Sequence, residues 1–193
     1  MRQNPARRTA LLDAAIEVLA REGSRGLTFR AIDAEAKVPA GTSSNYFANR
    51  AELLRQIMDR THERLTPEAT ALADTMQAGP STELVTTLMH QLVDRMRADR
   101  SSYLAMLELR LEATRRPEIQ RDLNKVFSAE LDSNVRFHIE AGLPGDRIAV
   151  VLLYLATLGL IVDDLTVPET LAPYPYDELI GEMVKRLVTP CPE

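Results

Sequence analysis

Residues 37–54 read KVPAGTSSNYFANRAELL, and the first half of this stretch differs from the sequence on both sides of it. The flanking segments are rich in good helix formers, with apolar residues at helical spacing. The stretch itself places proline, glycine, threonine, two serines and asparagine before the aromatic pair Tyr46-Phe47. Small polar residues of this kind are weak helix formers. The segment is therefore either a surface loop or a short helix whose composition serves a contact.

Helical periodicity extends along nearly the whole chain, and no segment shows the alternation of a β-strand. We predict an all-α protein of about nine helices, with a three-helix head in residues 1–48 and a larger helical body in residues 49–193. Thr28 is expected to cap the second helix of the head, and Asn49 with Glu52 forms the pattern of a capping box. The short segment from Pro39 to Tyr46 is thus predicted to be helical, with proline near its first turn.

The composition is that of an ordinary globular protein, with 45% hydrophobic and 26% charged residues among 193. The single cysteine, Cys191, excludes a disulfide framework, and with no recognisable secretory signal it indicates a cytoplasmic protein. The longest apolar run, residues 148–162, is shorter than the roughly 18–20 residues of a membrane span. We therefore expect no membrane segment. The three widely spaced histidines predict no metal site, and no motif predicts a cofactor.

The net charge of −5 is unevenly distributed along the chain. Residues 1–50 carry eight basic and five acidic side chains, a net charge of +3, so residues 51–193 carry −8. A basic N-terminal module on an acidic body suits contact with a polyanion, although a surplus of this size also arises by chance.

The first 50 residues fit a helix-turn-helix motif preceded by a supporting helix. In such a motif a short helix enters the major groove, and small polar side chains let it approach the base edges. Thr42, Ser43 and Asn45 are the candidates for reading bases, whereas Tyr46 and Arg50 are expected at the phosphate backbone. The full set of predicted DNA contacts is Thr28, Arg30, Lys37, Pro39, Ala40, Gly41, Thr42, Ser43, Ser44, Asn45, Tyr46 and Arg50.

Two segments of the body carry more apolar residues than a chain of this size easily covers, namely residues 148–162 and 179–187. They are the candidate surface for self-association across a two-fold axis, although residues 148–162 could instead be the central helix of the body. The predicted dimer contacts are Leu152, Leu155, Leu158, Leu179, Ile180, Met183, Val184 and Leu187.

The ordered run of motifs in about residues 7–55 resembles the TetR family of bacterial transcriptional repressors. The family pattern has a glycine-containing loop, then Thr-x-x-x-Ile-Ala-x-x-Ala-Gly-Val, a short helix ending in aromatic residues, and a capped Lys/Arg-x-x-Leu-Leu helix. The matching residues are Gly23 or Gly26, Thr28, Ile32, Ala36, Val38, Gly41, Tyr46, Phe47, Arg50, Leu53 and Leu54.

Two departures from that pattern bear on the expected DNA contacts. Lys37 stands where the family has glycine, and if the turn needs a left-handed backbone, lysine costs about 1 kcal/mol there. The Lys37 charge could meet a phosphate. Ser44 stands where tyrosine is common, so one usual contact with the DNA backbone is missing or shortened.

The resemblance implies an all-α homodimer that binds a palindromic DNA operator, a body that encloses a small-molecule pocket, and repression relieved when an effector binds. It implies no enzymatic activity. At helical spacing, residues such as those predicted to line the pocket are more often plain core. For Arg110, an ion pair to a carboxylate such as Glu108 is favoured over contact with an anionic ligand group. The predicted pocket residues are Met58, His62, Met89, Met96, Tyr103, Met106, Leu107, Arg110, Phe127 and Tyr154.

Two functions of other classes compete with this interpretation. An enzyme would need a constellation such as a phosphate-binding glycine loop or a nucleophile elbow, and neither is present in the sequence. A helical adaptor that uses its head to bind another protein, without DNA, is the second alternative. Binding to DNA at low salt separates the adaptor from the regulator.

Overall fold

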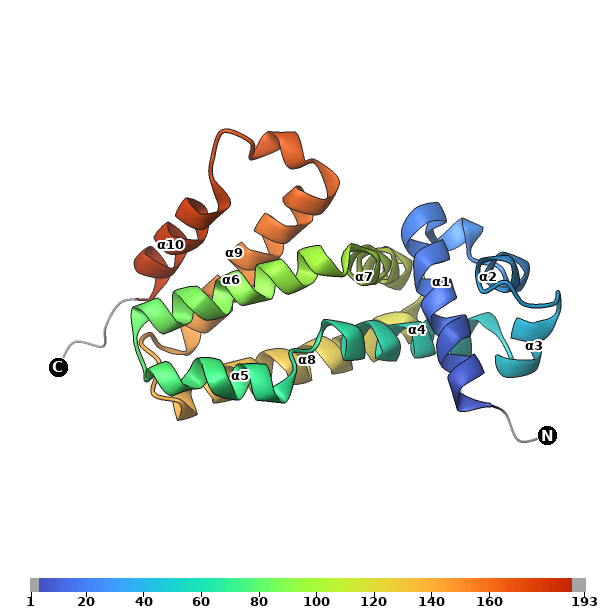
Figure 1. Ribbon diagram of the computed structural model, residues 1–193, viewed down its shortest axis with the longest axis horizontal. Helices are drawn as coiled ribbons and strands as arrows, with labels where there is room; N and C mark the ends of the chain where they lie inside the picture. Colours follow the sequence, from blue (N-terminus) through green and yellow to red (C-terminus); the bar gives the residue numbers. More distant parts are fainter. Residues whose placement is uncertain (1–3, 189–193) are drawn as a thin grey trace. The chain divides into compact units, whose positions relative to one another are not determined.

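The computed structural model describes residues 4–188, and these residues form helices and connecting turns with no β-strand among them (Figure 1). The prediction of an all-α fold is confirmed. Cys191 lies outside the described residues. The helices are α1 (Pro5–Gly26), α2 (Phe29–Glu35), α3 (Thr42–Tyr46), α4 (Arg50–Leu65), α5 (Ala69–Thr75), α6 (Thr82–Ala98), α7 (Arg100–Ala113), α8 (Pro117–Glu140), α9 (Arg147–Thr166) and α10 (Tyr176–Leu187), with two 3₁₀ turns, η1 (Met76–Ala78) and η2 (Pro168–Thr170).

Polar side chains define where the helices of the head begin. The Thr28 hydroxyl accepts the Ala31 N–H at 3.1 Å, and the Asn49 side chain accepts the Glu52 N–H at 2.9 Å. Both predicted caps are therefore confirmed. Glu52 returns a bond to the N–H of Ala48 (2.8 Å), so the capping box is present but displaced by one residue.

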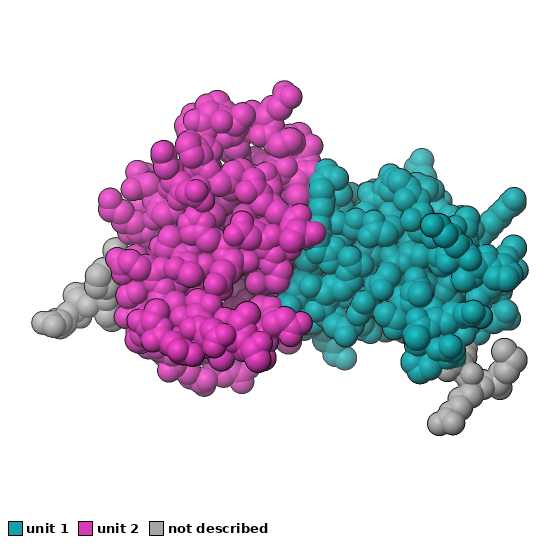
Figure 2. Space-filling model, in the orientation of Figure 1, with its two compact units in different colours: residues 1–66, 99–126 teal, residues 67–98, 127–193 magenta. Residues whose placement is uncertain are grey.

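The chain is divided into two compact units (Figure 2). Unit 1 comprises residues 1–66 and 99–126, and unit 2 comprises residues 67–98 and 127–193. This division differs from the predicted boundary after residue 48. The difference arises because α4 and α7 pack on α1 and so belong to the same unit as the head.

Unit 1 is centred on α1, which packs against α2, α4 and α7. An apolar stripe of α1 is buried, with Leu11, Ile16 and Leu19 wholly inaccessible to solvent. The second layer is α4, which contributes the buried residues Leu53 and Ile57. The head helices α2 and α3 lie side by side at the edge of this unit (Figure 1).

Unit 2 is built from α6, α9 and α10, which pack against one another. Its turn after α8 is fixed by the buried His138, whose Nε2 lies 2.9 Å from the Pro144 carbonyl oxygen. The buried core of this unit consists of Leu84, Val85, Leu143, Leu153, Val184 and Val188.

Helix α9 is longer than the sequence indicated. It has 20 residues, and its most apolar 18-residue window has a mean hydropathy of 2.1, so by length and composition it could cross a membrane. The expectation that no apolar segment reaches that length is corrected. The core helix of a soluble protein passes the same test, and here only 33% of the window is buried within the chain.

Candidate nucleic-acid interface

The turn between α2 and α3 is organised by a buried carboxylate, that of Asp33, which is 2% exposed. Its Oδ2 accepts the Gly41 N–H at 2.7 Å, and its Oδ1 accepts the Ser43 N–H at 2.7 Å. The Ser43 hydroxyl donates to the same Oδ1 at 2.5 Å. These contacts join the middle of α2 to the first turn of α3, so the carboxylate compensates for its burial with three hydrogen bonds.

The backbone of this turn is left-handed at two positions. Gly41, the residue before α3, has φ 88°, a conformation that glycine adopts without the steric cost of a side chain. Lys37 has φ 54° and is the only residue other than glycine with a positive φ in the described chain. The structure thus confirms that the turn requires a left-handed residue at position 37, and lysine supplies it under strain.

The three predicted base readers occupy two different environments. Thr42 is half-buried and Asn45 is exposed on α3. Their side chains donate to backbone carbonyls of the preceding turn, Thr42 Oγ1 to Pro39 at 2.5 Å and Asn45 Nδ2 to Gly41 at 3.0 Å. Ser43 is 0% exposed because it faces Asp33, so the prediction that it reads a base is corrected.

The neighbouring predicted contacts remain accessible. Ser44 is exposed and its hydroxyl donates to the Gly41 carbonyl oxygen at 2.8 Å, while Tyr46 is half-buried. The exposed residues of the predicted set also include Thr28, Arg30, Lys37, Pro39, Ala40 and Gly41.

Arg50 has a different role from the one predicted for it. Its guanidinium donates to the Leu27 carbonyl oxygen at 2.5 Å, to the Ser24 carbonyl oxygen, and to the Ser24 hydroxyl at 2.8 Å. The Ser24 N–H in turn donates to Glu108 Oε2 at 3.2 Å, and Gly23 before it has φ 68°. Because Arg50 is half-buried in these bonds, it fixes the end of α1, after the non-helical Gly23, and the connection to α2, rather than a phosphate.

The end of α3 is secured by aromatic and cationic contacts. Phe47 is 1% exposed and stacks on Phe29 with the ring centroids 6.5 Å apart, so it faces the interior. The Arg8 guanidinium lies over the Phe47 ring, and its Nη2 donates to the Tyr46 carbonyl oxygen at 2.9 Å. No pattern in the sequence indicates this contact, since Arg8 lies 38 residues before Tyr46.

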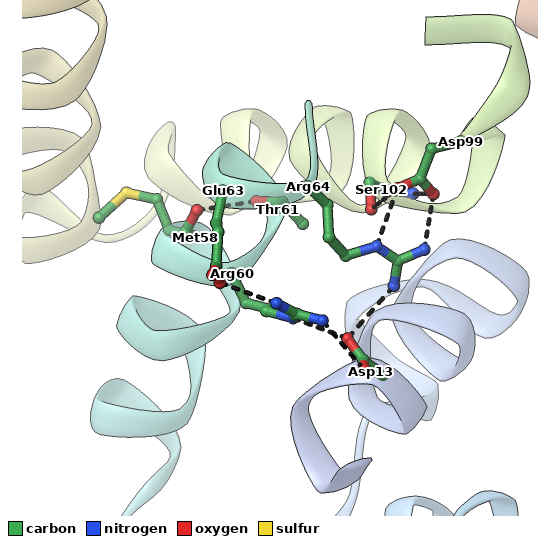
Figure 3. Close-up of polar contacts among 8 residues, drawn as sticks. All are labelled: Asp13, Met58, Arg60, Thr61, Glu63, Arg64, Asp99 and Ser102. Carbon is green, nitrogen blue, oxygen red and sulfur yellow. Dashed lines mark hydrogen bonds and ion pairs between the residues drawn. The ribbon is translucent and has the colours of Figure 1, made fainter. Parts of the chain in front are cut away.

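A cluster of ion pairs ties three helices of unit 1 together (Figure 3). Arg64 of α4 donates two hydrogen bonds to Asp99, the cap of α7, from Nε at 2.8 Å and from Nη2 at 2.7 Å. Its third nitrogen, Nη1, lies 3.4 Å from Asp13 Oδ1 of α1. Arg60 of α4 binds Asp13 at 2.8 and 3.2 Å. The Asp13 carboxylate and the neighbouring Glu63 raise the pKa of Arg60. These contacts hold α1 of the head against α4 and α7.

Asp99 both pairs with Arg64 and caps the first turn of α7. Its Oδ1 accepts the Ser102 N–H at 3.2 Å and its Oδ2 accepts the Ser102 hydroxyl at 2.8 Å. Burial alone would raise the pKa of this carboxyl. The hydrogen bonds from Arg64 and Ser102 outweigh burial, and the pKa of Asp99 is lowered.

The ten residues predicted to line a pocket are distributed over both units, and their assignment stays a prediction. Two open grooves in unit 2, one at the end of α8 and one along α10, contain none of them. His62 is exposed on the last turn of α4. Met58, Met96, Tyr103 and Met106 are buried, and Met89, Leu107, Arg110, Phe127 and Tyr154 are half-buried.

The predicted dimer residues separate into a surface set and a core set. Ile180 and Val184 are 1% and 0% exposed because they pack inside unit 2, so their assignment to an interface is corrected. On α9, Leu152 and Leu155 are 42% and 54% exposed, in line with Ile148 at 64%. The half-buried members are Leu158, Leu179, Met183 and Leu187, of which Leu179 and Met183 line the groove along α10.

The short helix-turn-helix in unit 1, with a small polar face on α3, defines the class of helix-turn-helix DNA-binding proteins. Comparison with known families agrees. Residues 11–57 match the family described as bacterial regulatory proteins, tetR family. Residues 80–190, more than half of the chain, match the family described as tetracyclin repressor-like, C-terminal domain. The chain belongs to the TetR family of transcriptional regulators.

Individual relatives support this assignment. The HTH-type transcriptional regulator BetI of Agrobacterium fabrum is 28% identical over 145 residues, which are 75% of this chain and 69% of that protein. The HTH-type nicotine-responsive transcriptional repressor HdnoR of Paenarthrobacter nicotinovorans is 26% identical over 162 residues, 82% and 80% of the two chains.

Solved structures share the fold over the whole chain. The multidrug binding protein EbrR in complex with imidazole is 26% identical, with a TM-score of 0.68 over 98% of each chain. The fatty acid degradation regulator FadR of Bacillus halodurans has a TM-score of 0.72 over 97% of each chain at 19% identity, a likeness that concerns the fold alone.

Proposed function

We propose that this protein is a cytoplasmic homodimeric repressor that binds a palindromic operator through α3 and leaves it when a small molecule binds the body. The observation that carries the proposal is the reading face of α3. Thr42, Ser44 and Asn45 are small polar residues on a helix whose position is fixed by the buried Asp33. Such a face can approach base edges in the major groove, where asparagine pairs with adenine and hydroxyls accept or donate.

Phosphate contacts are assigned to the exposed residues around that face. Arg30 and Lys37 provide the cations, and Thr28 lies at the start of α2. Contacts with phosphates fix the register of a protein on DNA, whereas contacts with base edges select the sequence. Binding should therefore weaken steeply as the salt concentration rises.

Dimerisation is assigned to the uncovered face of α9. Ile148, Leu152, Leu155 and Gly159 recur at helical spacing and are all exposed. A Cβ atom added at Gly159 would meet no atom within 4 Å, so this position is open and a partner helix could approach it closely. A two-fold axis through such a face would present two α3 helices to a palindrome, about 34–36 Å apart for half-sites in successive major grooves.

The effector is proposed to be a small organic molecule. The HdnoR relative is described as nicotine-responsive, and EbrR is described as a multidrug binding protein with structures in complex with ethidium and malachite green. The predicted pocket residues of this chain include three methionines that are buried and could adapt to varied apolar ligands. An effector that prefers a conformation with a different half-site spacing would shift the population away from the DNA-bound state.

Selection of DNA from a random-sequence pool tests the function directly. The protein is incubated with the pool at low salt, bound duplexes are recovered and sequenced, and the enriched sequence is inspected for two-fold symmetry. We expect a palindrome. No DNA binding at low salt would overturn the proposal and favour the protein-binding adaptor, because phosphate contacts are strongest under that condition.

A thermal-shift screen tests the response to small molecules. Nicotine, ethidium and a panel of apolar cations and fatty acids are added to the DNA-free protein, and compounds that raise Tm are tested for release of the enriched duplex. We expect at least one compound to do both. A compound that raises Tm but leaves the complex with DNA intact contradicts its role as an effector.

A further inference from the structure

We infer that Asp33 is a positioning residue for DNA reading: its carboxylate sets the orientation of α3 and thereby the discrimination between sequences. The inference rests on the proposed function, since it concerns the same reading helix. Asp33 touches no base in this assignment. It acts through the backbone of α3.

The first support is the small number of other contacts that orient α3. The helix has five residues, and its own backbone bonds complete little more than one turn. Its main packing partner among the helices is α2, and Arg8 of α1 donates to the carbonyl oxygen of its last residue, Tyr46. Phe47 anchors the end of α3, where the Phe47 N–H donates to the Ser43 carbonyl oxygen at 3.0 Å. At the opposite end, Gly41 offers no side-chain cap.

Asp33 supplies hydrogen-bond acceptors for the amides at the beginning of α3. Both amides that it binds, those of Gly41 and Ser43, belong to the first turn, where a helix has no internal acceptors. The Ser43 hydroxyl adds a third bond and is itself removed from the surface. Three bonds that converge on one carboxylate fix both the position and the rotation of α3. Among the described residues, Asp33 is the side chain that accepts from these two amides.

This device is a departure from the family pattern. In Thr-x-x-x-Ile-Ala the residue after isoleucine is alanine, and this chain has Asp33 after Ile32. Alanine accepts no hydrogen bond, so the carboxylate and Ser43 form a polar contact that the pattern does not contain. Replacing Asp33 should therefore leave buried donors without an acceptor, whereas replacing Ser43 removes only one of the donors to the carboxylate.

The functional consequence differs between the two kinds of DNA contact. Base reading depends on the angle and depth of α3 in the groove, whereas contacts of exposed cations with phosphates tolerate small changes. Loss of the Asp33 carboxylate should weaken binding to the selected sequence. Binding to unrelated DNA should stay the same or tighten slightly, because a negative charge near the phosphates is removed. A variant that is merely less folded would lose both affinities in equal proportion.

The test compares two duplexes of equal length, the one enriched by the wild-type protein and a scrambled version of it. Their Kd values are measured by fluorescence anisotropy at one salt concentration for wild type, Asp33→Ala, Asp33→Asn and Ser43→Ala. Asp33→Ala is expected to lower the ratio of the two affinities roughly tenfold or more. Asp33→Asn keeps one acceptor but turns an amide NH₂ toward Gly41, so its loss is intermediate. Ser43→Ala loses a single bond and has the smallest effect.

Glu35→Ala is the matched control. It removes the same charge from the same helix, but Glu35 is partly exposed and pairs with Arg21 at 2.8 Å. The ratio of affinities should remain within about twofold of wild type.

Amide hydrogen exchange of the DNA-free protein supplies a second readout. Asp33→Ala should lose protection at Gly41 and Ser43 and retain it in α1 and α4. If Asp33→Ala does not fold, Asp33→Asn and Ser43→Ala carry both measurements. Folded variants that keep the wild-type affinity ratio overturn the inference. A wild-type protein that enriches no duplex overturns the proposed function instead, and unchanged protection in the variants then overturns the positioning role as well.

Discussion

The five-residue α3 and the twenty-residue α9 both expose the surface assigned to a partner, but they are held in the chain by different forces. The first turn of α3 is fixed by hydrogen bonds to a buried carboxylate, and its outer face is polar. Helix α9 is fixed by the apolar residues of its inner face, Leu153 and Ile161 among them, and its outer face is apolar as well.

The difference follows from what each helix is proposed to meet. DNA is highly charged and hydrated, so a helix that reads it needs directional contacts and an exact orientation. A second copy of α9 offers apolar area, and burial of that area is favourable without precise direction. Polar bonds set geometry in unit 1, whereas exposed apolar area in unit 2 is available for association.

The largest expected effect comes from charging the outer face of α9. The double variant Leu152→Glu and Leu155→Glu should raise the dissociation constant of the dimer roughly 100-fold or more, because a buried, unpaired carboxylate costs several kcal/mol. Folding of each protomer should be retained, since both side chains are exposed. Light scattering coupled to gel filtration measures the change.

Leu111→Glu is the control for that experiment. Leu111 is 52% exposed but lies on α7, outside the proposed interface, so this variant should stay dimeric. A double variant of α9 that remains dimeric would refute the interface.

The second effect concerns the polar contacts of unit 1. Arg64→Met should lower the free energy of unfolding by about 2 kcal/mol, between the values for exposed and fully buried pairs. The side chains of Arg64 and Asp99 are 24% and 20% exposed, which justifies the intermediate value. Urea unfolding followed by circular dichroism checks it. Arg55→Met, whose pair with Asp122 has exposures of 50% and 32%, should cost less than 1 kcal/mol.

The third effect is a pH dependence that arises at Asp99. The folded protein lowers the pKa of this carboxyl, so its contribution to stability is present above the unfolded pKa of about 3.9 and is lost as the pH falls through the lower, folded pKa. The free energy of unfolding should therefore decrease as the pH is lowered from about 5 toward 3. In Asp99→Asn the decrease should be smaller. If the free energy of unfolding falls equally steeply with pH in wild type and in Asp99→Asn, Asp99 does not contribute to the pH dependence.

The smallest effect is a gain in stability at the turn before α3. Lys37 adopts φ 54°, which glycine adopts without strain. Lys37→Gly should raise the free energy of unfolding by about 0.5–1 kcal/mol. Since Lys37 is also assigned to a phosphate, the variant should bind DNA more weakly and with a shallower salt dependence. A lower free energy of unfolding for Lys37→Gly would contradict the backbone strain assigned to Lys37.

The helices could be predicted from the sequence wherever a cap or an apolar stripe marked them. Thr28 and Asn49 identified the starts of α2 and α4. Helix α5 was not predicted because it contains alanine, threonine and aspartate and buries no residue, so no apolar period reveals it. The division into units could not be predicted, because it depends on α7 packing against α1 far away in the sequence.

The candidate site was predicted in outline but not in its internal bonds. The exposed polar residues of α3 follow from composition. Composition alone also places Ser43 and Arg50 at the surface, whereas both form hydrogen bonds inside the head. The burial of Asp33 is hidden from composition for the same reason. A signal existed, since aspartate directly after the buried Ile32 replaces the alanine of the family pattern.

The loop between α1 and α2 has a consequence for the order of folding during synthesis. Its Ser24 N–H is bonded to Glu108, and the carbonyl oxygens of Ser24 and Leu27 are bonded to Arg50. Translation at about 5–20 residues per second brings Glu108 out of the ribosome roughly 3–12 s after Arg50. A nascent chain that has emerged only as far as Arg50 therefore lacks one partner of this loop. The hydrogen bonds that hold the connection next to the DNA-binding helices are complete only after α7 has emerged.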